Sequence, residues 1–148
     1  MKLRVFDINR KSKIKCELSI DEEFKIIYCK FSGIYEIGSK GNMDGLFIFS
    51  KICSVYFLFD TIAVIILDLK ELNYSFGNTL LKSLNFFEEI GRDKEEKEKE
   101  IIIIVSEQNQ MSIGEVMKML TKNRVKVHHD YSEAINEAII FAENDIMD

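Results

Sequence analysis

The chain has 148 residues, of which 47% are hydrophobic and 30% are charged, a composition typical of water-soluble globular proteins. This length suits one domain with a substantial core and is short for two. The net charge of −5, without a basic stripe, disfavours a nucleic-acid partner, because such binding depends on clustered Lys and Arg side chains. We therefore expect a single domain over residues 1–148.

The N-terminus and the cysteines bear on the compartment in which the chain works. Residues 1–13 hold no apolar segment and no small-residue cleavage site, so a secretory signal is not expected. The apolar stretch Leu46–Leu69 is interrupted by Lys51 and Asp60, which indicates a helix followed by a strand instead of a membrane span. The three cysteines show no CxxC spacing, which is typical of a reducing environment. The prediction is a cytoplasmic protein without a membrane partner.

The first third of the chain is expected to form β-strands. Apolar and polar residues alternate over Leu3–Ile8, Ile14–Leu18 and Phe24–Phe31. A polar turn over Asn9–Ser12 separates the first two of these segments. Such alternation is typical of antiparallel strands that keep one wetter face.

A glycine-containing break then leads to an unusual helix, expected over Met43–Phe59 with Asn42 or Asp44 at its start. One apolar stripe at helical spacing consists of Leu46, Phe49, Cys53 and Tyr56. A second stripe consists of Ile48, Ile52, Val55 and Phe59. A helix that is apolar over most of its circumference is either enclosed in the protein or packed against another chain. The second stripe is our candidate homodimer interface.

From Thr61 onward, strand and helix patterns alternate. The runs AVIILDL (63–69) and IIIIVS (101–106) are rich in β-branched residues, as expected of strands buried on both faces of a parallel sheet. Between them, apolar residues recur at steps of three and four, which predicts a helix: Leu80, Leu81, Leu84, Phe87 and Ile90. A strand, helix, strand crossover follows from this order.

Two further helices are expected to begin with capping boxes, Ser112 with Glu115 and Asp130 with Glu133. RVKVHHD, residues 124–130, is a polar strand suited to a sheet edge. The last helix carries an inward stripe of Ala134, Ile135, Ala138, Ile139 and Ala142. The whole pattern predicts an α/β fold: a mixed sheet with N-terminal antiparallel strands and a parallel core, covered by about four helices.

The order of these elements resembles the STAS domain, the fold of anti-sigma-factor antagonists. In that family the loop after the central strand reads roughly Asp-Leu-Ser-Gly-Val and, a few residues later, Asp-Ser-Ser-Gly, and one Ser there can be phosphorylated. The matching stretch here is DLKELNYSFG, residues 68–77, which is about two residues shorter and lacks the Asp before Ser75; Phe76 stands at the second Ser. The resemblance covers about Phe24 to Phe141, so residues 24–142 form the STAS-like core and residues 1–23 add extra strands.

The resemblance implies a non-catalytic regulatory module that binds another protein through the loop over residues 73–78. Ser75 is then either a phosphoacceptor, favoured by the positive end of the following helix, or a helix-capping or turn residue. Tyr74 or Phe76 could equally be tucked into the core. The candidate contact set is Asn73, Tyr74, Ser75, Phe76, Gly77 and Asn78.

Three other stretches have a functional and a structural interpretation. The glycine-rich Gly38–Asn42 could bind an anion or serve as a flexible connection. His128 and His129 suggest a metal site, but the side chains of neighbouring residues on a strand point to opposite faces of the sheet. No metal site is therefore predicted. The mixed charges of Asp93–Glu100 suit a solvated loop more than a docking tract.

No catalytic constellation stands out, so we expect neither an enzyme nor a cofactor. The chain has no G-x-S-x-G elbow, although His128 or His129 could meet Ser75 across adjacent loops. Two alternatives to the regulatory module stay open. One is an immunity-type protein that neutralises a bacterial toxin by charge complementarity. The other is a small crotonase-like enzyme in which Gly77 would contribute to an oxyanion hole.

Overall fold

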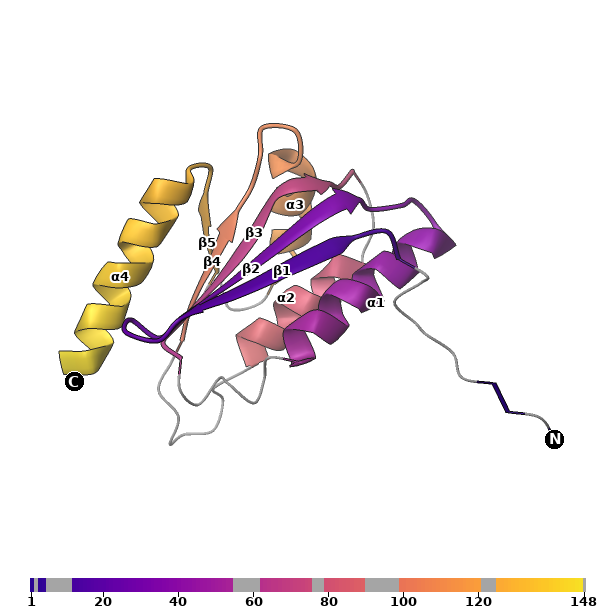
Figure 1. Ribbon diagram of the computed structural model, residues 1–148. Helices are drawn as coiled ribbons and strands as arrows, with labels where there is room; N and C mark the ends of the chain where they lie inside the picture. Colours follow the sequence, from indigo (N-terminus) through magenta and orange to yellow (C-terminus); the bar gives the residue numbers. More distant parts are fainter. Residues whose placement is uncertain are drawn as a thin grey trace.

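The computed structural model describes residues 1, 3–4, 12–54, 62–75, 79–89, 99–120 and 125–147. Five strands and four helices follow one another in these residues (Figure 1). Their bounds are β1 (Lys15–Asp21), β2 (Ile26–Ile34), α1 (Ser39–Ser54), β3 (Val64–Asn73), α2 (Thr79–Glu89), β4 (Glu100–Ile104), α3 (Gln110–Met117), β5 (Val125–His128) and α4 (Tyr131–Met147).

The strands form one sheet in the order β1-β2-β3-β4-β5, which is also their order along the chain. β1 and β2 are antiparallel, and β2 through β5 are parallel to one another. This arrangement confirms the predicted mixed sheet with an antiparallel start and a parallel core. It also confirms that the short strand after α3 lies at an edge of the described sheet.

Helices cover the two faces of the sheet unequally. α1, α2 and α3 lie on one face and α4 lies on the other (Figure 1). The larger buried cluster joins odd-numbered residues of β3 and β4, such as Leu67 and Ile103, to the three helices. The smaller cluster joins Ile66 and Ile102 to the alanine stripe of α4, Ala134, Ala138 and Ala142. The runs AVIIL and IIII are therefore apolar throughout because both of their faces are buried.

The stripe of α1 that was expected to form a dimer interface faces the core instead. Ile48 and Ile52 are 1% and 0% exposed and pack into the larger core cluster, so they cannot form a dimer interface in the folded protein. On the other stripe Leu46 is 41% exposed, while the ring of Phe49 packs edge-on against Phe86 of α2. The dimer interface expected at Ile48 and Ile52 is therefore wrong, and its other two residues, Val55 and Phe59, lie outside the described residues.

The start of α1 also differs from the prediction. The helix begins at Ser39, and Asp44 lies inside it, buried, where its carboxylate accepts hydrogen bonds from the Ser12 hydroxyl at 2.7 Å and the Glu36 amide at 2.8 Å. The carboxylate thus joins the segment before β1 and the loop after β2 to α1. Aspartate is also a common residue at helix N-caps, which explains why the sequence pattern placed the start of α1 near Asp44 instead of at Ser39.

The two predicted capping boxes have different outcomes. Asp130 caps α4 by accepting from the amides of Ser132 and Glu133, at 2.7 and 3.2 Å. Ser112 does not cap α3, because that helix already begins at Gln110. The strand expected over Leu3–Ile8 and most of the charged run Asp93–Glu100 lie outside the described residues. Within the part of the chain that is described, no helix is long and apolar enough to cross a membrane.

Candidate functional site

The parallel strands β2, β3 and β4 end at one edge of the sheet, and the loops that follow them form the candidate site. At the centre of this edge β3 ends in Asn73, followed by Tyr74 and Ser75. Asn73 and Ser75 are exposed, and Asn73 pairs with Ile34 at the end of β2. Carboxyl ends of parallel strands are where open α/β sheets bind their ligands and partners.

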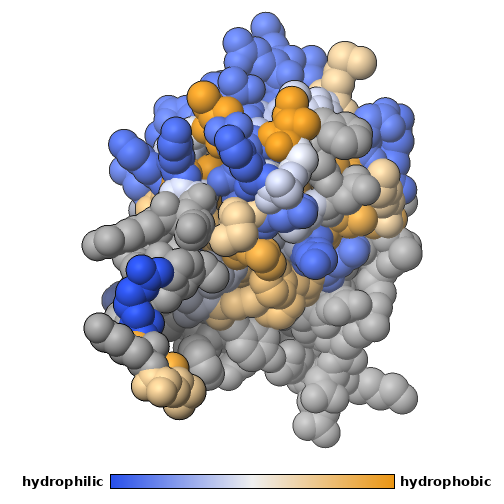
Figure 2. Space-filling view, turned by 90° about the vertical axis from the view of Figure 1, so that its right-hand side faces the viewer, coloured by the Kyte–Doolittle hydropathy of each residue, from blue (hydrophilic) through white to orange (hydrophobic). Residues whose placement is uncertain are grey.

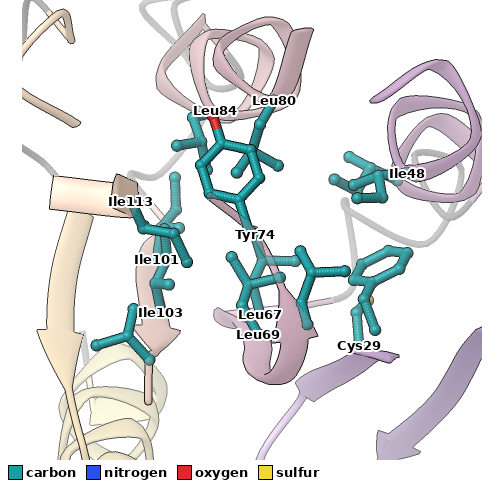
Figure 3. Packing of buried hydrophobic residues seen from close by; sticks show 14 of the residues in the cluster. Cys29, Ile48, Leu67, Leu69, Tyr74, Leu80, Leu84, Ile101, Ile103 and Ile113 are labelled. Atoms are coloured by element: carbon teal, nitrogen blue, oxygen red, sulfur yellow. The ribbon is translucent and has the colours of Figure 1, made fainter. Parts of the chain in front are cut away.

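Tyr74 takes the core alternative of the two considered for it. Its side chain is 2% exposed and points between Leu80 and Leu84 of α2 (Figure 3). The ring packs edge-on against Tyr35, with centroids 4.9 Å apart, and burial raises the pKa of the Tyr74 hydroxyl to about 12. The prediction of Tyr74 as an exposed contact residue is therefore wrong, because its ring fills the apolar space between β3 and α2. Phe76, Gly77 and Asn78 lie outside the described residues, and so does the oxyanion hole considered at Gly77.

The helices α1 and α2 approach each other closely beside this loop. A Cβ added at Gly45 would lie 2.4 Å from the Thr79 Cβ and 2.5 Å from the Tyr35 hydroxyl oxygen, so only glycine fits there. The Thr79 hydroxyl donates to the Asn42 side-chain oxygen at 2.8 Å, joining the first turns of the two helices. Burial raises the pKa of the Tyr35 hydroxyl above its ordinary value. The N-terminus of α2 is therefore held rigidly against α1.

The glycine-rich stretch Gly38–Asn42 is mostly helix, not a loop. Gly38 has a positive φ of 73° and its carbonyl accepts from the Gly41 amide at 3.0 Å, which opens α1. Gly41 is buried, and a Cβ there would lie 2.0 Å from the Glu36 carbonyl oxygen. The flexible connection considered for this stretch is thus confined to its first residue, and Lys40 is exposed on the helix.

Asn109 is a site residue that the sequence analysis missed. It is buried between α3 and β3, and its side-chain nitrogen donates to the carbonyls of Leu69 and Leu72 at 2.7 and 2.9 Å. Its side-chain oxygen accepts from the Ser106 amide at 2.8 Å, and its own amide donates to the Ser106 hydroxyl at 3.2 Å. Asn109 therefore positions the end of β3, from which the loop departs. The spacing Ser-x-x-Asn before a helix was the available signal.

Two exposed apolar side chains were also missed. Ile34 lies at the end of β2, next to Asn73, and Ile37 lies in the loop after β2. The view in Figure 2 shows hydrophobic groups standing among hydrophilic ones on the side of the molecule where α1 begins. We call Ile34, Ile37, Asn73 and Ser75 the loop-edge surface. Apolar groups beside exposed amides and hydroxyls are a composition suited to protein partners.

The two histidines are separated, as expected for neighbours on a strand. His128 faces α4 and its ring bonds to the Glu137 carboxylate, whereas His129 is exposed. Because α4 lies on the opposite face of the sheet from α2, His128 is directed away from the helix that follows Ser75. Among the described residues, no group of His, Cys, Asp and Glu side chains could hold a metal ion.

Comparisons with known proteins agree with this fold. No family model matches the chain, and no curated protein matches it by sequence. An anti-sigma factor antagonist from Mycobacterium paratuberculosis superposes with a TM-score of 0.59 at 11% identity, over 86% of this chain and 95% of that one. The fold is that of a STAS-like domain. A protein of the DUF3478 family with a SpoIIAA-like fold, from Shewanella loihica, is 16% identical over 84% of this chain and 93% of its own, with a TM-score of 0.48.

At such low identity the likeness concerns the fold, and the site must be judged on its own residues. The STAS-like architecture predicted from element order is confirmed, since one chain of this fold aligns over nearly its full length. The sheet and the four described helices follow one another in the order that the resemblance implied.

Proposed function

We propose that this chain is a regulatory protein-binding module of the anti-sigma-factor-antagonist type, which binds its partner through the loop over residues 73–78. The observation that carries the proposal is the exposure of Asn73 and Ser75 at the carboxyl end of the central strand, in a fold shared with an anti-sigma factor antagonist. We propose that it works in the cytoplasm, where its cysteines, all unpaired, would stay reduced.

Rigid support beneath the loop favours a binding role. Asn109 fixes the carbonyls of Leu69 and Leu72, and Tyr74 anchors the chain in the core directly between the two exposed residues. A partner that binds a preorganised surface loses less conformational entropy on association. The exposed Ile34 and Ile37 add apolar area at the rim of the same edge.

Ser75 is the proposed regulatory residue of the module. It is exposed and lies four positions before Thr79, the first residue of α2. A phosphate on Ser75 would carry negative charge near the positive N-terminal end of that helix. Such a charge would also change the electrostatic match between the loop-edge surface and a partner.

The test is capture of partners from the source cell by the wild-type chain and by Ser75→Asp and Asn73→Arg variants. We expect an anti-sigma factor or a kinase that regulates one to be captured by the wild type and lost, at least tenfold, with each variant. Ser54→Ala is the matched control, because Ser54 is an exposed serine at the far end of α1 and its loss should leave capture unchanged. Capture that is unaffected by both loop variants would contradict the proposed site, and capture of a toxin would favour the immunity-type alternative.

A further inference from the structure

The outer edge of β1 is not paired with another strand in the described part of the molecule. β1 is the terminal strand of the described sheet, and its register with β2 runs without a break from Lys15 opposite Ser32 to Asp21 opposite Ile26. Natural sheets protect such edges with bulges, prolines, very short strands or charged side chains, and the charges of β1, Lys15, Glu17 and Asp21, lie on one face only. β1 has seven residues, no bulge in its pairing with β2 and no proline, since the whole chain has none. The other edge strand, β5, has only four residues.

The side chains of β1 form two distinct rows. Cys16, Leu18 and Ile20 share the face covered by α1, because their β2 partners Phe31, Cys29 and Ile27 belong to the larger core cluster. Leu18 and Ile20 are nevertheless 50% and 46% exposed, so the helical layer stops short of this edge. The opposite face of β1 carries only polar side chains, Lys15, Glu17, Ser19 and Asp21. The apolar row is thus a continuation of the core that nothing described here covers.

We propose that the free edge of β1 pairs antiparallel with β1 of a second copy of this chain, about a two-fold axis at Leu18. In this register Leu18 faces Leu18 of the second copy, and Cys16 faces Ile20. On the other face Lys15 lies opposite Asp21, a pair of opposite charges, and Glu17 lies opposite Ser19. Directly opposed side chains of these kinds stabilise antiparallel pairs. The result is one continuous sheet of two copies, with both apolar rows joined on the same face.

Neighbouring registers are less favourable on the same sequence. An axis at Glu17 places the two Glu17 carboxylates opposite each other, and an axis at Ser19 places Glu17 opposite Asp21. Like charges in directly opposed positions destabilise a pair of strands. A slip by one residue sets the apolar row of one copy against the polar row of the other. Charge and hydrophobicity therefore select the register centred on Leu18.

The other candidate for this edge is the chain's own N-terminal segment, residues 1–11. The described residues before β1 turn away from the free edge. The Ser12 hydroxyl bonds to Asp44 of α1, and Ile14 is buried in the larger core cluster. A Cβ at Gly33 of β2 would lie 3.3 Å from the Lys13 carbonyl oxygen, so the chain just before β1 packs against β2, away from the outer edge of β1. These contacts favour a second copy as the occupant.

Sedimentation of the full chain over a concentration series tests the proposal. We expect a species of twice the 17.3 kDa monomer mass that dissociates on dilution. Leu18→Lys puts two ammonium groups on the axis and should shift the chain to monomer, with its melting temperature and circular dichroism kept because Leu18 is half exposed. Leu46→Lys, an exposed leucine on α1, is the control and should leave the dimer intact. A wild-type chain that is monomeric at every concentration would overturn the proposal.

A charge exchange tests the register. Lys15→Glu places a carboxylate opposite Asp21 of the second copy. The two-fold axis makes this like-charge pair occur twice, so the dissociation constant of the dimer should rise about tenfold or more. The double variant with Asp21→Lys restores opposite charges and should recover the dimer. Asp21 also accepts a hydrogen bond from the Phe24 amide, so the melting temperature of Asp21→Lys alone measures the loss of that turn contact, while the lysine opposite Lys15 of the second copy should weaken the dimer as well. Absence of recovery in a folded double variant contradicts the register.

Disulfide formation gives a geometric test that does not depend on affinity. In a background with Cys16→Ser and Cys53→Ser, Leu18→Cys should form a covalent dimer under mild oxidation, because opposed Cβ atoms lie close to disulfide range. Glu17→Cys in the same background should not. Equal crosslinking of the two variants would overturn the assignment. A full chain that is monomeric and dimerises only after removal of residues 1–11 would make its own N-terminus the occupant and would equally overturn it.

Discussion

Tyr74 shows at the scale of one residue how the loop proposed for binding is anchored by a buried side chain. Its backbone lies between the exposed Asn73 and Ser75, while its ring fills the space between β3 and α2. Alternation along an extended chain accounts for this, because consecutive side chains point to opposite sides. The burial of Tyr74 therefore directs the side chains of Asn73 and Ser75 towards solvent.

Replacing Tyr74 with Ala should strongly destabilise the protein. Truncating a buried aromatic side chain costs about 3–5 kcal/mol in the free energy of unfolding, since transfer and cavity terms add. Tyr74→Phe keeps the ring and should cost only about 1 kcal/mol, the scale of a lost hydrogen bond. Urea denaturation measures both values. A change below about 1 kcal/mol for Tyr74→Ala would show that the ring is not part of the core.

At the scale of elements, the contact between α1 and α2 depends on a missing Cβ atom. Gly45→Ala should lower the free energy of unfolding by about 1–3 kcal/mol, because the added methyl group would overlap Thr79 and Tyr35. Gly114→Ala is the matched control in α3, where a Cβ meets open space. There the better helix propensity of alanine should raise stability by up to about 1 kcal/mol. Chemical denaturation of the two variants should therefore give changes of opposite sign.

How far the sequence determines each element depends on how many arrangements its pattern permits. The runs AVIIL and IIII allow one, a strand buried on both faces, and β3 and β4 confirm it. The helix α1 is apolar on two stripes, so the pattern alone could not tell which stripe faces the sheet, and the wrong one was selected. Ser112 had the spacing of a cap, but Ser106 and Asn109 form the reciprocal pair at the start of α3.

The candidate site was predictable in place but only partly in detail. Element order located the loop after β3, which depends on topology alone. Asn109 belongs to the loop after β4 and Ile34 to the end of β2, and they reach this edge only because the parallel strands end together. Single-sequence patterns carry no information on such long-range proximity. That explains why the site was predicted as one loop and is a surface built from several.

At the scale of the whole molecule, stability towards acid should depend on the group that ties β5 to α4. Burial raises the pKa of the Glu137 carboxyl, but hydrogen bonds from Lys126 and His128 outweigh burial, so its pKa lies below the ordinary 4.5. The folded state then binds fewer protons than the unfolded state. The stabilisation from Glu137 is present above the ordinary pKa and is lost as the pH falls below it.

Glu137→Gln should therefore melt at a lower temperature than the wild type near neutral pH, and the difference should shrink between about pH 6 and pH 3. The mutation also removes the ion pair between Glu137 and Lys126, whose charged atoms are 2.8 Å apart. Glu143→Gln, at an exposed glutamate of the same helix, is the control and should follow the wild-type curve. A constant difference between wild type and Glu137→Gln at all pH values would contradict this assignment.

The coincidence of strand order with chain order has a consequence for how the protein is made on the ribosome. Each new strand can add to the edge of the one before it, so no strand has to insert between two that are already paired. The face formed by Ile66, Ile102 and Ile104 is covered by α4, which leaves the exit tunnel after the strands that it covers. Until that helix emerges, the nascent chain carries a bare apolar sheet face, and this interval between the synthesis of the strands and that of α4 is when it most needs a chaperone.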